Sequence, residues 1–161
     1  MKHTIILNPI DSLIKINGSD TTRMRIFSSP EYCREALNGM ELESGAEEIL
    51  SFLRNNSRNF KTIIVTSYDE AVVRLIASHF NIPYVDVYRG RINKPSLYVR
   101  AISKIGSDVN DTVVVSGTAV DLKDAETAGI VGLRYGVSRS QNSVKCLNDL
   151  LHHLGLNTNR P

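Results

Sequence analysis

The stretch of sequence that decides the fold is VVVSGTAVDLKDAETAGIVGLRYG, residues 113–136. It opens on a run of valines, passes through small and polar residues into a short helical pattern over Asp121–Ala128, and returns to an apolar run over Ile130–Tyr135. Gly129 is typical of the residue that ends a helix. A strand, a helix and a second strand in such close succession indicate a parallel α/β unit, because parallel neighbours need a crossover connection.

The rest of the chain repeats this alternation. Short runs rich in Ile and Val, with little polar alternation, predict strands that are buried on both faces of a sheet. These runs are Thr4–Leu7, Thr62–Val65, Tyr84–Val87, Thr112–Val115 and Ile130–Tyr135. Apolar residues at helical spacing predict helices over Gly45–Arg54, Glu70–Phe80, Ser96–Ile105, Asp121–Ala128 and Ser143–Leu154. We therefore predict an α/β fold with a doubly wound, parallel five-stranded sheet.

Residues 14–44 interrupt the alternation directly after the first strand and are predicted to form a short lid. Asn17-Gly18 is typical of a hairpin tip, so we expect Ser12–Ile16 to pair with an extended piece around Met24–Phe27. The sequence Ser29-Pro30 then predicts the N-cap and the first position of a short helix.

The lid is too short to form a separate domain. Residues 1–155 are therefore predicted to form a single domain, and residues 156–161 to form a polar, frayed tail.

Composition excludes several classes of protein. The 161 residues are 42% hydrophobic and 22% charged, as in an ordinary globular domain. The net charge of +2 is too small for a nucleic-acid-binding surface, and no apolar run is long enough to span a membrane. The N-terminus lacks the apolar core of a signal peptide, and Cys33 and Cys146 have neither zinc nor redox spacing. We expect a cytoplasmic protein that binds neither nucleic acid nor membranes.

The ends of the predicted strands carry the functional information, because ligands of doubly wound sheets bind there. Thr66 closes the second buried run, Lys94 precedes Pro95, and Ser116-Gly117 closes the run that leads to Asp121. In order and spacing these positions resemble the second, third and fourth motifs of the haloacid dehalogenase-like (HAD) superfamily. The resemblance covers residues 4–136 and implies a Rossmann-like hydrolase domain, here with a minimal cap.

Three carboxylates that the resemblance implies are missing. The first motif of the family is DxDxT, in which the first Asp is the nucleophile and the second is the general acid and base. Asn8 and Ile10 stand at these positions, and Gly117 replaces a magnesium-binding Asp of the fourth motif. An amide is a poor nucleophile, and isoleucine cannot transfer a proton. We therefore expect no catalytic residues and no cofactor, with Asp121 as a weak metal ligand and Mg²⁺ relevant only to an active enzyme.

The remaining polar residues allow two interpretations. Thr66, Ser67 and Lys94 could hold a phosphate without reacting with it. Thr66 and Ser67 fit equally well as caps of the following helix, and Lys94 as an ordinary loop lysine. Asp121 is favourable near the start of a helix through the helix dipole alone.

Three functions are consistent with these residues. The first is a degenerate HAD-like domain, a pseudophosphatase, that serves as a regulatory module for an unknown protein partner or a second copy of itself. Its contact residues would lie in the lid: Arg23, Met24, Arg25, Ile26, Phe27 and Tyr32. The alternatives are an active phosphatase or hydrolase with an atypical site, and a non-catalytic binder of a phosphorylated ligand.

Overall fold

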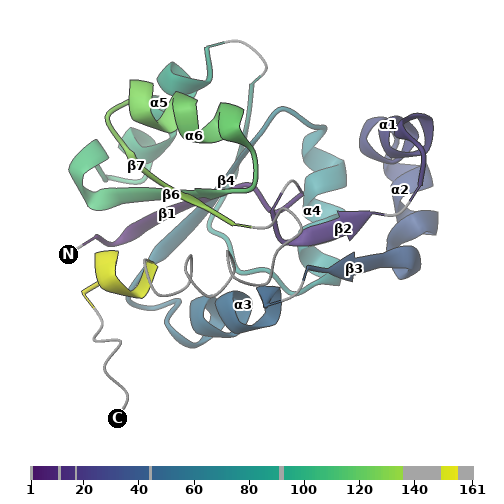
Figure 1. Cartoon of the computed structure of the whole chain (residues 1–161), viewed down its shortest axis with the longest axis horizontal. Helices are drawn as coiled ribbons and strands as arrows, with labels where there is room; N and C mark the ends of the chain where they lie inside the picture. Colours follow the sequence, from purple (N-terminus) through teal and green to yellow (C-terminus); the bar gives the residue numbers. More distant parts are fainter. Residues whose placement is uncertain are drawn as a thin grey trace.

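The computed structural model describes residues 2–10, 12–16, 18–43, 45–90, 93–135 and 150–155 (Figure 1). Asn17, Cys146, the predicted helix before residue 150 and the predicted tail 156–161 lie outside the described residues. None of the helices in the described ranges is long and apolar enough to cross a membrane.

A parallel five-stranded sheet forms the centre of the molecule, with the strand order β5-β4-β1-β6-β7. Its strands are β1 (Thr4–Leu7), β4 (Lys61–Thr66), β5 (Val87–Arg89), β6 (Thr112–Ser116) and β7 (Val131–Arg134). All five strands predicted from the sequence are therefore present. The strand predicted from Tyr84 begins only at Val87, and Val85 is 61% exposed rather than buried in the sheet.

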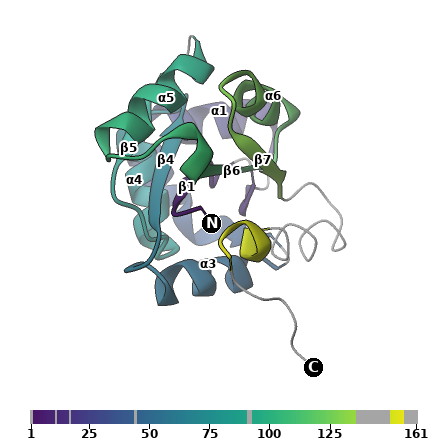
Figure 2. The same cartoon turned by 90° about the vertical axis from the view of Figure 1, so that its left-hand side faces the viewer.

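Helices cover both faces of this sheet, as Figures 1 and 2 show. One face packs against α3 (Ala46–Asn55) and α4 (Glu70–His79), and the other against α5 (Lys94–Lys104) and α6 (Ala119–Thr127). Alternate residues of β1 supply both cores: Ile5 belongs to the first and Ile6 to the second. This two-sided burial explains why the strands read as continuous apolar runs. It confirms the predicted doubly wound α/β fold.

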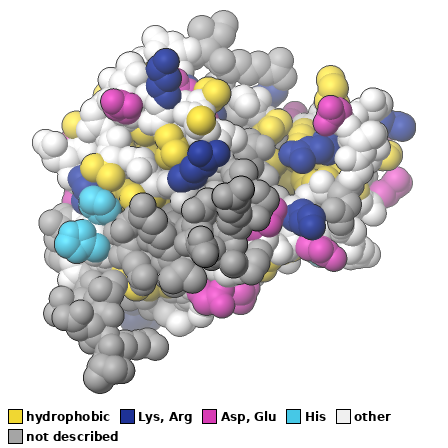
Figure 3. Space-filling view, viewed as in Figure 1, with side chains coloured by type: hydrophobic (Ala, Val, Ile, Leu, Met, Phe, Trp, Pro, Cys, Tyr) yellow, Lys and Arg dark blue, Asp and Glu magenta, His cyan; other side chains and the backbone are white. Residues whose placement is uncertain are grey.

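The insertion after β1 consists of two short strands and two helices. The strands β2 (Ile14–Ile16) and β3 (Met40–Leu42) pair antiparallel, and between them lie α1 (Asp20–Ser28), α2 (Pro30–Ala36) and a single 3-10 turn. A second 3-10 turn, Val109–Asp111, precedes β6. Charged side chains of both signs are spread over the insertion, at the right of Figure 3.

The predicted pairing of Ser12–Ile16 with Met24–Phe27 is wrong, because Met24–Phe27 lies inside α1. The Ser19 hydroxyl caps this helix by accepting a hydrogen bond from the Thr22 amide at 3.3 Å, so the chain turns into a helix directly after Gly18. The true partner of β2 is β3, which follows both helices. Because two helices separate β2 from β3 in the sequence, no local sequence pattern indicates that these strands pair.

The predicted start of the following helix is confirmed. Ser29 is the N-cap of α2, and its hydroxyl accepts a hydrogen bond from the Tyr32 amide at 3.3 Å. Pro30 occupies the first helical position, where its missing N–H costs nothing.

We expect Ser29→Ala to destabilise the fold by about 1 kcal/mol, because α2 loses its capping acceptor. Ser28→Ala is the matched control. Ser28 lies in the last turn of α1 and donates to the Met24 carbonyl, so its loss should change stability by less than about 0.5 kcal/mol. Urea unfolding of both variants measures the difference, and equal effects would contradict the capping role.

Candidate functional site

Four polar side chains meet at the carboxyl ends of the central strands. Asn8 follows β1, and its backbone N–H continues the pairing with β6 by donating to the Val115 carbonyl at 3.2 Å. Ser116 is the last residue of β6, Asp121 lies in the first turn of α6, and Lys94 is the first residue of α5. The doubly wound topology brings these ends to one edge of the sheet.

Asp121 is the centre of this cluster and is only 2% exposed. The Lys94 ammonium lies 2.5 Å from its Oδ1 atom. Its Oδ2 atom accepts two hydrogen bonds, from the Asn8 side-chain amide at 2.8 Å and from the Ser116 hydroxyl at 2.7 Å. Both carboxylate oxygens are therefore engaged by donors of the protein itself. We call these four residues the Asp121 cluster.

The Asp121 cluster controls the protonation of its carboxylate. Burial by itself raises the pKa of Asp121, but the hydrogen bonds from Lys94, Asn8 and Ser116 outweigh burial and hold the pKa below its usual value. Asp121 is consequently an anion at neutral pH, with a lysine ammonium as its counter-ion. A buried charge of this kind requires such partners to be tolerated.

Local structure explains how two members reach the cluster. Thr118 caps α6 and accepts a hydrogen bond from the Asp121 amide at 3.2 Å, so the helix begins at Ala119 and turns the carboxylate inward. Asn93 precedes α5 in the left-handed conformation, with φ of 53°. Lys94 therefore begins a helix instead of lying in a loop, which corrects the interpretation as a loop lysine.

The chemistry of these donors does not fit a magnesium ion. Mg²⁺ prefers carboxylate and phosphate oxygens, whereas Asp121 is already paired with an ammonium. A carboxylate only accepts hydrogen bonds, so Asn8 must turn its amide nitrogen toward Asp121. Gly117 offers no side chain, and Ile10 is 1% exposed within the hydrophobic core. In the described parts of the chain, no three His, Cys, Asp or Glu side chains converge on one point.

The three residues predicted to hold phosphate have different partners in the structure. Thr66 is completely buried, and its hydroxyl accepts a hydrogen bond from the Tyr68 amide at 3.0 Å. Lys94 belongs to the Asp121 cluster, and Ser67 lines a separate cleft. The alternative role of Thr66 and Ser67 as helix caps is wrong. Asp69 caps α4, and its carboxylate accepts from the Ala71 amide at 2.8 Å. Phosphate binding by these residues stays a prediction.

The predicted contact residues of the lid divide into exposed and buried positions. Met24 is 71% exposed, and Arg25 is exposed with its guanidinium 4.6 Å from the ring centre of Tyr32. Ile26 and Phe27 are only 3% and 8% exposed, so they are not the exposed apolar side chains that the sequence indicated, and their role as contact residues stays a prediction. They belong to the main hydrophobic core, because α1 packs against α2 and α4.

Sequence reasoning missed Ser116 and Arg89. Ser116 is the residue directly before Gly117 at the end of a buried strand, and this position alone could have indicated it. Arg89 ends β5 and lines the same cleft as Ser67, and a single basic residue in a short turn gives no sequence signal of this position.

We expect Asn8→Asp to convert the Asp121 cluster into a site that responds to Mg²⁺. A second carboxylate against Asp121 creates like-charge repulsion, so Tm should fall in EDTA and recover in millimolar MgCl₂. Thermal unfolding under both conditions tests this, with Asn38→Asp at an exposed position as the control for added charge. An equal response of the unaltered protein to Mg²⁺ would contradict the poor fit of the present donors.

The lowered pKa of Asp121 predicts how stability depends on pH. A carboxylate whose pKa is lower in the folded state stabilises the fold above its unfolded pKa of about 4, and this contribution is lost as the pH falls through the folded value. The stability difference between the protein and Asp121→Asn should therefore shrink below about pH 4. Urea unfolding at several pH values measures it. Glu126→Gln, exposed on the same helix, is the control, and a pH-independent difference would refute the prediction.

Comparison with known proteins shows which fold this is. No protein-family model matches the chain, and no curated protein matches its sequence. Solved structures do match. A haloacid dehalogenase-like family hydrolase from Streptococcus pneumoniae aligns with a TM-score of 0.63 and 13% identity over 90% of both chains. The HAD domain of effector protein Lem4 from Legionella pneumophila aligns with a TM-score of 0.65 and 11% identity over 95% of both chains.

A HAD-like family hydrolase from Porphyromonas gingivalis is similar to a comparable degree. Its TM-score is 0.61, with 10% identity over 94% of this chain and 98% of that one. At such low identities the similarity concerns the fold. The chain therefore has the fold of the HAD-like hydrolases, as the strand-end motifs predict.

Proposed function

We propose that this protein is a catalytically inactive domain of the HAD-like hydrolase fold, a pseudophosphatase that acts by binding and serves as a regulatory module. The observation that carries the proposal is the hydrogen bond from the Asn8 amide to Asp121. Asn8 stands at the end of the central strand β1, where the resemblance to the family implies the nucleophilic aspartate.

The site lacks the nucleophile, the general acid and base, and the unpaired carboxylates that the family's chemistry requires. Asn8 has an amide in place of a carboxylate, and the amide is held by Asp121. The position of the general acid and base is Ile10, whose side chain packs in the core and carries no proton. Asp121 is the only carboxylate of the cluster, and Lys94 neutralises it. The residues that remain support the fold and the burial of one ion pair.

The insertion supports a role in binding. Met24 and Arg25 present an apolar and a cationic side chain on neighbouring positions of α1. Such a mixed, exposed surface suits contact with a protein partner or with a second copy of this chain. Because Ile26 and Phe27 hold α1 against the core, this surface is presented on a fixed helix.

We expect no release of phosphate when the purified protein is incubated with a panel of phosphate esters, with or without Mg²⁺. The reason is that Asn8 and Ile10 stand where the family has its nucleophile and its general acid and base. Free phosphate and thermal shift are followed in the same samples. Lys94→Met is the matched variant, because it removes the cation of the cluster; its circular dichroism and Tm verify that the fold persists without the counter-ion of Asp121.

One result would overturn the proposal. This is Mg²⁺-dependent turnover that persists through repeated purification and is lost in Lys94→Met. It would show an active phosphatase with an atypical nucleophile.

A further inference from the structure

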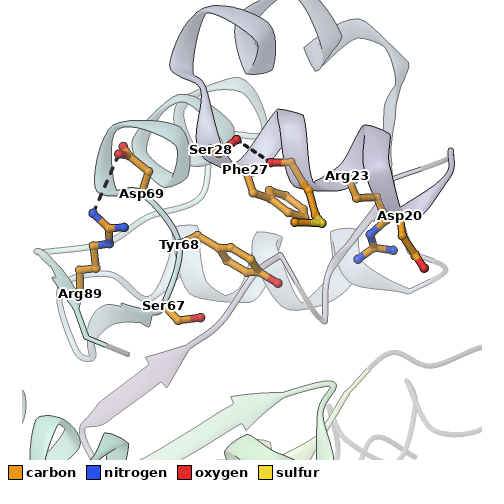
Figure 4. Close-up of a pocket in the computed structure, with 9 residues that line it drawn as sticks. Asp20, Arg23, Phe27, Ser28, Ser67, Tyr68, Asp69 and Arg89 are labelled. Carbon is orange, nitrogen blue, oxygen red and sulfur yellow. Dashed lines mark hydrogen bonds and ion pairs between the residues drawn. The ribbon is translucent and has the colours of Figure 1, made fainter. Parts of the chain in front are cut away.

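A cleft of about 480 Å³ lies outside the Asp121 cluster, between α1 and the carboxyl ends of β4 and β5 (Figure 4). One wall comes from the insertion and includes Arg23 and Phe27. The other comes from the loop after β4 and the end of β5, and includes Ser67, Tyr68 and Arg89. Its volume is in the range of about 300–1,000 Å³ that small-molecule sites occupy. No residue of the Asp121 cluster lines it.

The middle of the cleft is aromatic. The rings of Phe27 and Tyr68 lie 4.5 Å apart between centres, at 35° to each other. They join α1 to the loop after β4, and Figure 4 shows them between the two charged ends of the cleft. Phe27 is packed in the core and Tyr68 is half-buried, so both rings are held in place. A flat ligand could pack on this surface without first ordering it.

The two ends of the cleft carry guanidinium groups. Arg23 lies over the Phe27 ring at 5.9 Å, and among the described residues it makes no ion pair. Arg89 lies 4.0 Å from Asp69, a distance at the outer limit of an ion pair. Both groups therefore retain donors for a ligand, and a guanidinium is suited to phosphate and carboxylate.

Two carboxylates, Asp20 and Asp69, line the cleft, and the negative charge of each lies at the N-terminus of a helix. Asp69 is the N-cap of α4 and accepts from the amides of Ala71 and Val72. Asp20 is exposed in the first turn of α1, where the helix dipole favours a negative charge. The lining thus carries two guanidinium groups and two carboxylates, and the Asp69 carboxylate is already engaged by backbone amides.

We propose that this cleft binds a small organic anion that carries an aromatic ring, of the class of aryl phosphates. The ring lies against Phe27 and Tyr68, and the anionic group reaches the guanidinium of Arg23 or Arg89, with the Ser67 hydroxyl as a further donor at the wall. The inference rests on the proposed function, since the ligand is held away from the Asp121 cluster and is not transformed.

The test is isothermal titration of the whole 161-residue chain with phenyl phosphate. We expect phenyl phosphate to bind about tenfold more tightly than inorganic phosphate, which lacks the ring, and than phenol, which lacks the charge. Cyclohexyl phosphate keeps both size and charge but has no aromatic face, and it should bind more weakly than phenyl phosphate.

Substitutions in α1 and β5 test whether phenyl phosphate binds in the cleft. At least one of Arg23→Met and Arg89→Met should weaken phenyl phosphate binding about tenfold, the effect of losing a charge-assisted hydrogen bond, and the one that does so marks the end where the phosphate binds. Arg34→Met is the matched control and should bind as the unaltered protein does, because Arg34 is exposed on α2 of the same insertion and does not line the cleft. Circular dichroism and Tm verify that each variant is folded.

The outcomes separate this inference from the proposed function. No binding of phenyl phosphate, or binding that Arg23→Met and Arg89→Met leave unchanged, overturns the cleft as its site. Binding lost only in Lys94→Met places the anion at the Asp121 cluster and also overturns it. Release of phosphate from phenyl phosphate during the titration contradicts the proposed function. Whether phenyl phosphate binds in the cleft is then still decided by the affinities of the Arg23→Met and Arg89→Met variants.

Discussion

The buried charge of Asp121 is the constraint on which the rest of this site depends. A carboxylate at 2% exposure needs compensation, and Lys94, Asn8 and Ser116 provide it from three different elements. The cluster thereby ties α5 and α6 to the ends of β1 and β6. The same contacts occupy both oxygens of the carboxylate. A metal ion would therefore have to compete with these three donors, and above all with the Lys94 ammonium, for the carboxylate.

A second consequence of the fold is that the cleft beside α1 and the strand-end cluster lie in different places. The insertion folds as two helices between a pair of short strands, and α1 is fixed by Ile26 and Phe27 in the main core. This position brings Arg23 to the loop after β4, so that a cleft with an aromatic centre forms beside the sheet edge. The proposed binding role rests on this separation between the Asp121 cluster and a pre-formed cleft.

Much of the fold could be predicted from the sequence, because its strongest signals are local. The buried strands read as β-branched runs, and the helices α3, α4 and α5 show apolar residues at helical spacing. The insertion was predicted poorly for the opposite reason. The pairing of β2 with β3 spans two helices, and Asn17-Gly18 is followed by a helix cap instead of a returning strand. The site was predicted in part: Asn8, Lys94 and Asp121 were singled out, whereas Ser116 and Arg89 were not.

The sequence by itself determined which chemical groups stand at the ends of the strands. Folding cannot change the covalent structure of these groups, which are the amide of Asn8, the alkyl chain of Ile10 and the missing side chain at Gly117. Only the tertiary structure decided how the remaining groups are used. It paired Lys94 with Asp121, enclosed Thr66, buried Phe27 and left Arg23 facing the cleft. Contacts between residues distant in the chain decide these outcomes, since burial and charge compensation arise only when the elements pack together.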